Sequence, residues 1–533
     1  MITDKKHYKQ FVAKVGTRFE ILTKFPIIGL IIIGLIGVLI RLVFLDVELP
    51  IRQDANAYFW YAMDMSILRN VPYSAHVNDG WPMLLSIFFK IFNYTNYQDY
   101  ATLQRIGSIL ISSLTIIPIY FLCRKFTNQA LSLVGASLFV FEPHIIQNSL
   151  FGLTEPLYIF LGTGSLSLFL SNNKKLFYTS FAIAAFATIV RAEGITIFVI
   201  LLVTFLINNK KEKKIVREIF LVIIIFSVVF VPMTIIKFQT SSGNASIQGI
   251  VSYSYGSIID AEHREEIQNN LLKGIEIMVK RIGQSMIPYF AFFVPFGIIL
   301  IWKNRNKENV LVMVSLIIYS LVAIRMFIGV GDLRLIFFLY PLFVILSLLT
   351  IKYVSDNIEF KRVFLISVIG AVLLLSLFFL YSNTEPDYNR EVNQFAKYMI
   401  KNVKVSNNFY PESGYIYGVW ASSNLKFPIL SSDVEYTGPE LLDYVKETNF
   451  VYLDQSANSV EEYIRLAKDQ NLSHLVIDNN EKRQLYFKDV FYHEEKYPYL
   501  IKEFDSYKEG YSHYNVKVFK IDYKYFDSKL KND

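Results

Sequence analysis

The chain has 533 residues, of which 53% are hydrophobic and only 19% charged, so its composition is not that of a soluble protein. Its formal net charge of +7 comes from basic residues between long apolar runs, which argues against a nucleic-acid partner. The single cysteine, Cys123, excludes an intramolecular disulfide framework and any multi-cysteine metal site. We therefore predict a polytopic α-helical membrane protein.

The amino-terminal segment, residues 1–26, contains six lysines and arginines but only two acids, which predicts a cytoplasmic location. The first apolar run, residues 27–45, has the length of a membrane span, about 17 to 25 residues. Its end reads Leu-Asp-Val-Glu-Leu-Pro, from Leu45 to Pro50, and has no small-residue cleavage site. We therefore predict a retained span and not a signal peptide.

Residues 46–100 are predicted to form a long first external loop. The loop begins with an aromatic-rich stretch, residues 52–61, that contains one acid, Asp54. The later segment 80–92 is apolar but too short to cross a bilayer, so we expect it to be re-entrant or interfacial.

Ten further spans are predicted at residues 101–122, 129–145, 153–171, 176–191, 194–207, 215–236, 284–302, 310–328, 334–351 and 361–381. The loops that return to the cytoplasm in this topology are short and basic, as in Arg124-Lys125 and in residues 210–217. About eleven spans in all place residues 383–533 on the outer side of the membrane.

The tail at 383–533 is polar and contains no run of spanning length. Helical pieces are expected at 389–401, 439–446 and 460–470, and strands at 415–419, 450–453, 474–477 and 515–521. This alternation predicts a soluble extracytoplasmic α/β domain, after a transmembrane domain at 1–382.

Ionisable residues that remain at membrane depth are costly, so they invite a functional interpretation. In the predicted topology they gather at the outer face: Arg41, Asp54, Glu142, His144, Glu155, Arg191, Glu193, Arg325, Asp332 and Arg334. Arginine binds phosphate through a planar fork of donors, and a nearby carboxylate can take a proton from an attacking group. Such a cluster suits a lipid-phosphate substrate.

Structural roles are the alternative for each of these residues. Arg41 and Arg325 could extend to the interface from span ends, and Arg191 with Glu193 could form an ion pair in a turn. Glu155 precedes a proline, as at a helix start, where an acid is favoured by the helix dipole.

The same holds for the residues of the first loop and for the histidine. His144 could be an interfacial histidine without a ligand role, and the aromatic run from Tyr58 to Tyr61 is typical of an aromatic belt. For Asp54 the alternative is an ordinary loop acid.

The order of these features resembles the GT-C superfamily of glycosyltransferases, in particular the branch with protein O-mannosyltransferases and aminoarabinose-type lipid transferases. The matching pieces are Leu39 to Leu45, Asp54 to Tyr58, Thr154-Glu155-Pro156, residues 190–194, and Asp332-Leu-Arg334 with Pro341. The resemblance in architecture covers nearly the whole chain.

The resemblance implies an inverting transferase that takes a single sugar from a polyprenyl- or dolichyl-phosphate donor, with Asp54 as the catalytic base. It makes Arg191 and Arg334 the candidates for binding the donor phosphate. Arg41, Tyr58, Glu155, Glu193 and Asp332 are expected to support the site.

Departures from the family pattern narrow the prediction. Ala55 stands where the family often has a second acid. The Trp-Trp-Asp motif of oligosaccharyltransferases is missing, which disfavours en bloc transfer to asparagine. No Asp-x-Asp signature occurs near Asp54, so we predict no metal and no other cofactor.

Two other functions compete with this one. A transporter or flippase of lipid-linked sugars would favour interrupted helices and polar residues near the midplane. A non-catalytic membrane anchor for the tail would leave Asp54, Arg191 and Arg334 unexplained. The acceptor stays open between protein, lipid and glycan, and abundant Ile, Lys and Asn favour a prokaryotic cell membrane, archaeal or bacterial.

Overall fold

The computed structural model describes residues 25–47, 51, 54–67, 78–94, 97–210, 214–240, 264–303, 306–329, 333–384, parts of 387–398, 416–418, 457–468, 472, 474–479 and 484–530. The chain forms two compact units. The first comprises residues 1–45, 69–88 and 103–383, and the second comprises 46–68, 89–102 and 384–533.

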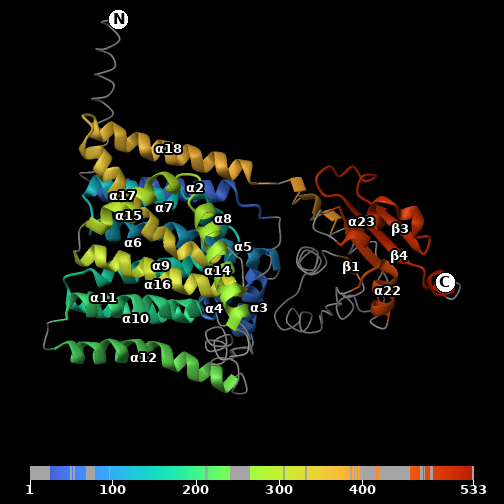
Figure 1. Ribbon diagram of the computed structural model, residues 1–533, viewed down its shortest axis with the longest axis horizontal. Coiled ribbons are helices and arrows are strands. Elements are labelled where there is room, and N and C mark those ends of the chain that lie inside the picture. Colours follow the sequence, from blue (N-terminus) through green and yellow to red (C-terminus); the bar gives the residue numbers. More distant parts are fainter. Residues whose placement is uncertain are drawn as a thin grey trace, which may run out of the picture. The chain divides into compact units, whose positions relative to one another are not determined.

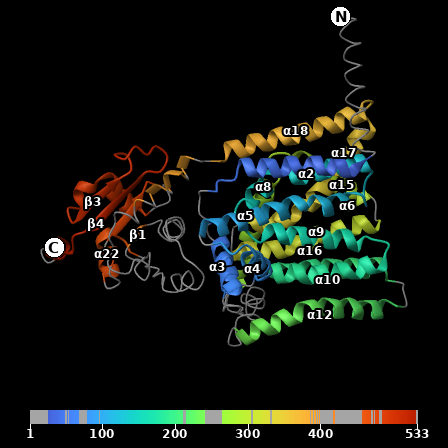
Figure 2. The ribbon, with the colours of Figure 1, turned by 180° about the vertical axis from the view of Figure 1, so that it is seen from behind.

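The first unit is a helical bundle, and its helices run side by side in both views (Figures 1 and 2). Its helices are α2 (Pro26–Val43), α4 (Gly80–Phe92), α5 (Tyr97–Leu114), α6 (Ile116–Cys123), α7 (Gln129–Val140), α8 (Pro143–Ser149), α9 (Glu155–Phe169), α10 (Lys174–Val190), α11 (Ile195–Asn208), α12 (Ile215–Thr240), α14 (Arg264–Ser285), α15 (Phe290–Lys303), α16 (Lys307–Gly329), α17 (Tyr340–Asp356) and α18 (Lys361–Ser382). Two 3₁₀ helices, η1 (Ala192–Gly194) and η3 (Leu333–Leu339), join them, while the ends of α4 and α5 belong to the second unit.

Six of the described helical stretches are long and apolar enough to cross a membrane, and up to eight if two bent helix pairs each count as one span. Each of the eleven predicted spans coincides with a helix or helix pair, but α9, α10 and α11 have only 15, 17 and 14 residues. The structure thus confirms a largely helical protein with several candidate spans. The number eleven stays a prediction.

The centre and the edges of the bundle differ in how much of each span is covered by protein. In the α17 span 83% of the apolar window is buried, compared with 17% in α12 and 28% in α18. Helices α12 and α18 lie at opposite edges of the bundle (Figure 1). The exposed apolar side chains of these edge helices suit contact with lipid.

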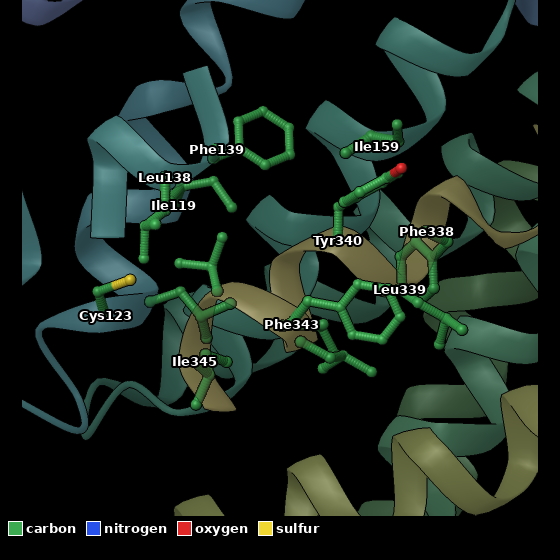
Figure 3. Packing of buried hydrophobic residues seen from close by; sticks show 14 of the residues in the cluster. Ile119, Cys123, Leu138, Phe139, Ile159, Phe338, Leu339, Tyr340, Phe343 and Ile345 are labelled. Carbon is green, nitrogen blue, oxygen red and sulfur yellow. The ribbon is translucent and has the colours of Figure 1, made fainter. Parts of the chain in front are cut away.

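Close packing in the bundle depends on small residues where helices cross. Buried side chains from α6, α7, α9, η3 and α17 interdigitate in the core (Figure 3). A Cβ on Gly297 of α15 would lie 2.2 Å from the carbonyl oxygen of Leu346 on α17, so only glycine permits this approach.

Arg41 lies inside the bundle rather than at the interface. Its side chain is fully buried, and its guanidinium donates to the Oγ atoms of Ser112 and Ser149, each at 3.1 Å. It also donates to the carbonyl oxygens of Gly37 at 3.0 Å and Val140 at 3.1 Å. Arg41 therefore ties α2 to α5, α7 and α8, and the interfacial alternative is wrong for this residue.

Helix α14 was not expected from the sequence, which predicted a loop there. Ile277, Met278 and Ile282 pack against the bundle core, while Leu272 and Val279 on another side are exposed. The described part of α14 from residue 272 is bent by 114° relative to α15, and α14 packs against α16 and η3. Since η3 carries Arg334, α14 supports one wall of the site described below.

The second unit is built on a four-stranded mixed sheet in the order β1-β2-β4-β3. The strands are β1 (Ile416–Gly418), β2 (His474–Asp478), β3 (Leu500–Asp505) and β4 (Val516–Ile521). Strand β1 pairs with β2 in parallel, and the other pairs are antiparallel. The described helices of this unit include α3 (Asp54–Ile67), α22 (Val460–Lys468), α23 (Leu485–Tyr492), η5 (Glu494–Lys496) and α24 (Tyr523–Leu530).

Most predicted elements of the tail that fall on described residues are found. Helix α22 and strands β1, β2 and β4 coincide with predicted segments, whereas α23, β3 and α24 were not predicted. The predicted helix at 439–446 and strand at 450–453 lie outside the described residues.

Candidate functional site

The first wall of the site is the start of α9, where Glu155 is placed by a fixed turn. The turn passes through Gly152, whose φ of +73° lies in the left-handed region that favours glycine. The Trp81 Nε1 and Gln104 Nε2 atoms donate to the Gly152 carbonyl at 2.9 and 2.8 Å. The helix then begins at Glu155 with a proline in its first turn, as the sequence predicted.

The second wall is the turn between α10 and α11. Arg191 follows the last residue of α10 with an extended backbone, φ −145° and ψ 134°, and its carbonyl accepts from the Gly194 N–H at 2.8 Å. A Cβ on Gly194 would lie 2.4 Å from the backbone nitrogen of Thr188, so the turn sits directly on the end of α10. This close contact fixes where Arg191 leaves the helix.

Arg191 joins the two walls through a buried ion pair. Its Nη1 atom lies 2.6 Å from Glu155 Oε1 and 3.2 Å from the Thr154 hydroxyl, while Nη2 lies 3.0 Å from Glu193 Oε1. The predicted Arg191–Glu193 ion pair is therefore present, but Arg191 also holds the more deeply buried Glu155. Breaking such a pair is costly because a charge stays buried without its partner.

The third wall is η3, which brings Arg334 to the same place. The Arg334 Nη1 atom lies 3.9 Å from Glu155 Oε1, and its side chain is 24% exposed, compared with 12% for Arg191. Because Arg191 already contacts two carboxylates closely, Arg334 is the more accessible cation. Among the described residues, two guanidinium groups and two carboxylates thus meet within one small volume.

These side chains line a pocket whose other walls are aromatic and aliphatic. The lining residues are Glu155, Tyr158, Ile159, Arg191, Glu193, Tyr319, Arg334, Leu335, Phe337 and Phe338. The space, including its open mouth, is about 240 Å³. The part of it that a water-sized group can occupy is about 10 Å³, which is room for about one water molecule.

One buried polar atom in this pocket, Glu155 Oε2, has no hydrogen-bond partner among the described residues, and its side chain is 3% exposed. The Tyr158 hydroxyl is also buried, and it interacts with the hydroxyl of Tyr319. Buried polar atoms in native proteins are normally paired. The Glu155 oxygen therefore marks the point in the pocket where a small polar group could supply a partner.

The remaining predicted residues fall elsewhere. Asp54 and Tyr58 belong to α3 in the second unit, where Asp54 is half-buried and Tyr58 is buried. Phe59 is also buried and packs against Phe89 and Tyr100, so much of this aromatic run lies inside protein rather than forming an exposed belt. Asp332 lies outside the described residues.

Arg41 and the Glu142–His144 pair belong to the bundle but do not line the pocket. The Glu142 carboxylate accepts from the backbone N–H of Ile145 at 2.7 Å, which caps α8, and lies 2.9 Å from His144 Nδ1. These contacts indicate a structural role at the bend between α7 and α8.

Sequence reasoning missed the two tyrosines, Tyr158 and Tyr319. Tyr158 lies one helical turn after Glu155, so its spacing could have placed both side chains on one face of α9. Tyr319 and Phe337 come from apolar segments that do not distinguish pocket from core. Among the described residues, no three His, Cys, Asp or Glu side chains come together in a way that could hold a metal ion.

The chain was compared with known protein families, with curated proteins and with solved structures. The model of a family described as predicted membrane protein, DUF2079, matches residues 83–412. A comparison with curated proteins found no match.

Among solved structures, the crystal structure of ArnT from Cupriavidus metallidurans bound to undecaprenyl phosphate is similar at 10% identity, with a TM-score of 0.54, over 92% of this chain and 97% of that one. The Archaeoglobus fulgidus oligosaccharyltransferase in complex with Zn and sulfate is similar at 13% identity, with a TM-score of 0.52, over 84% of this chain and 68% of that one. The same organism's AglB, with an inhibitory peptide and a dolichol-phosphate, gives 11% identity and a TM-score of 0.50, over 84% and 69%. At these identities the likeness shows the fold, and it confirms the resemblance to the GT-C superfamily at that level.

Proposed function

Because the chain belongs to the DUF2079 family of predicted membrane proteins and has a GT-C fold, we propose that it is a membrane glycosyltransferase that uses a lipid-phosphate sugar. It would move one sugar from a polyprenyl- or dolichyl-phosphate donor to an acceptor outside the cytoplasm, which can be a protein, a lipid or a glycan. The observation that carries this proposal is the pocket in which Arg191, Arg334 and Glu155 meet.

The donor phosphate is assigned to Arg334, with Arg191 behind it. The Arg334 side chain is 24% exposed, twice as much as that of Arg191, and a guanidinium binds phosphate oxygens through a planar fork of donors. The two structural neighbours with undecaprenyl phosphate and dolichol-phosphate share the fold, which supports a lipid phosphate as ligand. A cation beside the phosphate would stabilise it as the sugar leaves.

Asp54 is proposed as the general base. An acceptor hydroxyl or amide attacks the anomeric carbon as its proton passes to the Asp54 carboxylate. The bond from the anomeric carbon to the phosphate oxygen breaks, its electrons stay on the lipid phosphate, and the anomeric configuration inverts. Its place at the start of α3, half-buried, supports a shielded carboxylate in this role.

The proposed topology has eleven spans, with the amino terminus in the cytoplasm and residues 383–533 outside. The basic loops between predicted spans support this orientation. Donor and acceptor would then meet at the outer face of a prokaryotic cell membrane.

Sugar transfer in proteoliposomes tests the proposal, with radiolabelled polyprenyl-phosphate sugars as donors. Asp54→Asn is expected to lower transfer by roughly 10²- to 10⁴-fold while the donor still binds, because only proton removal is lost. Asp99→Asn, an exposed acid of the same predicted external loop, is the matched control and keeps wild-type transfer. Equal transfer by wild type and Asp54→Asn would remove Asp54 as the base.

A flippase of lipid-linked sugars is the alternative, and one observation favours it. Two helix pairs are interrupted, α7 with α8 at 53° and α14 with α15 at 114°, as in many transporters. The same proteoliposomes decide between the two functions. If labelled lipid crosses the bilayer without transfer to any acceptor, the flippase is correct.

A further inference from the structure

Helix α14 has an apolar side that the described residues leave exposed. The side chains that pack against the bundle core are those of Ile277, Met278 and Ile282. The exposed apolar side chains are those of Leu272, Ile275 and Val279, which we call the apolar strip of α14. At 3.6 residues per turn, the three residues of the strip fall within about 60° of one another around the helix axis. The strip indicates an apolar partner, because in water it would stay unburied.

A charged side adjoins the apolar strip. Its exposed residues are Lys273, Glu276 and Lys280. They also fall within about 60° of one another, and the middle of this group is turned by about 100° from the middle of the strip. Two lysines and one glutamate give this side a positive charge. A helix with lysines beside an apolar strip is typical of one that lies in the membrane interface.

The direction of α14 fits this position. The described part of α14 is bent by 114° relative to α15, which is 24° from a right angle (Figure 1). Phe292, Phe296 and Ile299 of α15 are exposed, as expected of a span that meets lipid. Ile287, between the two helices, is exposed as well. Where α15 crosses the bilayer, α14 therefore lies close to the membrane plane.

Two other environments fit α14 less well. Inside the hydrocarbon core, the exposed charges of Lys273, Glu276 and Lys280 would be costly to insert. In water, the apolar strip would have no partner. The interface accommodates both sides of the helix, because a lysine side chain extends along apolar surface and keeps its charge at the head groups. Lysines at this level attract anionic lipids.

We infer that α14 docks on the surface of an anionic lipid bilayer. The apolar strip enters the upper part of the acyl chains, and Lys273 and Lys280 bind the phosphate groups of anionic lipids. Since α14 also packs against η3, the docked helix holds one wall of the pocket at the membrane surface. The inference does not depend on the proposed function, because it concerns a different surface and needs no sugar transfer.

The depth of α14 is measured on the full chain in nanodiscs of phosphatidylcholine and phosphatidylglycerol. Cys123→Ser removes the single cysteine of the chain. The fluorophore NBD is then attached to one new cysteine, Leu272→Cys, Val279→Cys or Lys273→Cys. Labels at 272 and 279 should be quenched by lipids brominated in the upper acyl chain, whereas the label at 273 should be quenched by iodide in the water. The contrast between neighbouring positions 272 and 273 reports that the helix has its expected faces.

The two labels on the strip also give the tilt of the helix. Positions 272 and 279 are about 10 Å apart along the helix axis. A helix 24° from the membrane plane places them at depths that differ by about 4 Å. A difference near 10 Å would overturn the inference, because α14 would then cross the bilayer. Quenching at 279 by iodide and not by lipid would also overturn it, and so would protection from both, which would mean that a protein partner covers the strip.

The preference for anionic lipid is measured with the label at 279. Brominated phosphatidylglycerol should quench it more than brominated phosphatidylcholine at the same mole fraction, by an amount equivalent to roughly fivefold local enrichment for one net lysine charge. Lys273→Gln together with Lys280→Gln should remove this preference and leave the label in the acyl region.

Lys303→Gln together with Lys307→Gln is the matched control. It removes the same number of exposed lysines at the other end of α15, so the preference at 279 should stay as in wild type. Equal quenching by the two lipids in wild type, or an unchanged preference after loss of Lys273 and Lys280, would overturn the binding of anionic lipid by α14.

Discussion

Arg191→Gln is expected to destabilise the protein more than Glu155→Gln, although each variant removes one charge from the same ion pair. Arg191 lies 2.6 Å from one carboxylate and 3.0 Å from another. Its loss leaves both acids beside each other, and the nearest other described cation, Arg334, lies 3.9 Å from Glu155. Loss of the Glu155 charge still leaves Arg191 paired with Glu193.

The magnitudes follow from burial. Removing one partner of a buried ion pair costs about 3 to 5 kcal/mol, and the partly exposed Glu193 and the nearby Arg334 favour the lower end for Arg191→Gln. Glu155→Gln keeps a neutral acceptor for Arg191, so we expect about 1.5 kcal/mol, the lower end for a hydrogen bond to a charged group. The double variant should cost about 1 to 2 kcal/mol less than the sum, because the two groups interact.

Cys123 provides the assay. It is the single cysteine of the chain and is 1% exposed, so a thiol-reactive fluorogenic dye reports its exposure on thermal unfolding in detergent. We expect the thermal midpoint to be highest for wild type, lower for Glu155→Gln and lowest for Arg191→Gln, with the double variant close to Arg191→Gln. Glu276→Gln on the exposed face of α14 is the control and should match wild type.

The reasoning is refuted by either of two results. One is an Arg191→Gln midpoint at or above that of Glu155→Gln. The other is a double variant whose loss equals the sum of the single losses, which would mean that the two side chains do not interact.

Three further predictions use other parts of the chain. Gly194→Ala would place a Cβ within 2.5 Å of the α10 backbone, so it should lower the free energy of unfolding by about 1 to 3 kcal/mol and lower the midpoint reported by Cys123. Gly164→Ala is the control, because its Cβ would meet nothing within 4 Å, and it should be neutral or stabilising. Arg41→Met should lower the midpoint without changing undecaprenyl phosphate binding, because its four hydrogen bonds lie inside the bundle and leaving such groups unpaired costs about 1 to 3 kcal/mol each. Burial alone would raise the pKa of Glu391, but hydrogen bonds from the backbone N–H groups of residues 512–514 to its carboxylate lower the pKa overall. The ionised carboxylate therefore stabilises the folded state above pH 4.5, and this contribution is lost as the pH falls through the lowered pKa. Amide hydrogen exchange at residues 512–514 should therefore be faster in Glu391→Gln than in wild type at neutral pH, and the two exchange rates should become equal in acid.

The sequence predicts where the helices that carry the site begin and end better than it predicts which side chains pack against one another. Thr154-Glu155-Pro156 has the composition of a helix start, and residues 191–194 that of a tight turn, and both are found. Hydropathy reports how deep a residue lies but not what surrounds it. For this reason the burial of Arg41 inside the helical bundle was not predicted.

Two classes of element escaped prediction for different physical reasons. Helix α14 carries charged residues among its apolar ones, so it lacks the continuous apolar run by which spans are recognised. Strand β3 alternates buried and exposed positions around Lys502 and Glu503, and such short charged strands look like loops without their partner β4. Tyr158 was missed because a tyrosine in an apolar helix has the same signature in a core and in a pocket.

The hydrogen bonds of Arg41 also set an order of events during biosynthesis. Its partner Ser149 is 108 residues later in the chain, which a ribosome working at about 5 to 20 residues per second reaches roughly 5 to 20 s afterwards. During that interval α2 carries a guanidinium in its last turn, where insertion costs less than the about 2.5 to 3.5 kcal/mol of a helix centre. Because Arg41 lies near the end of α2, its long side chain can reach the aqueous surface until α5, α7 and α8 arrive. We therefore expect the Arg41 side chain to be solvated at the membrane surface in the nascent first helix, and to become buried when the later helices pack against it.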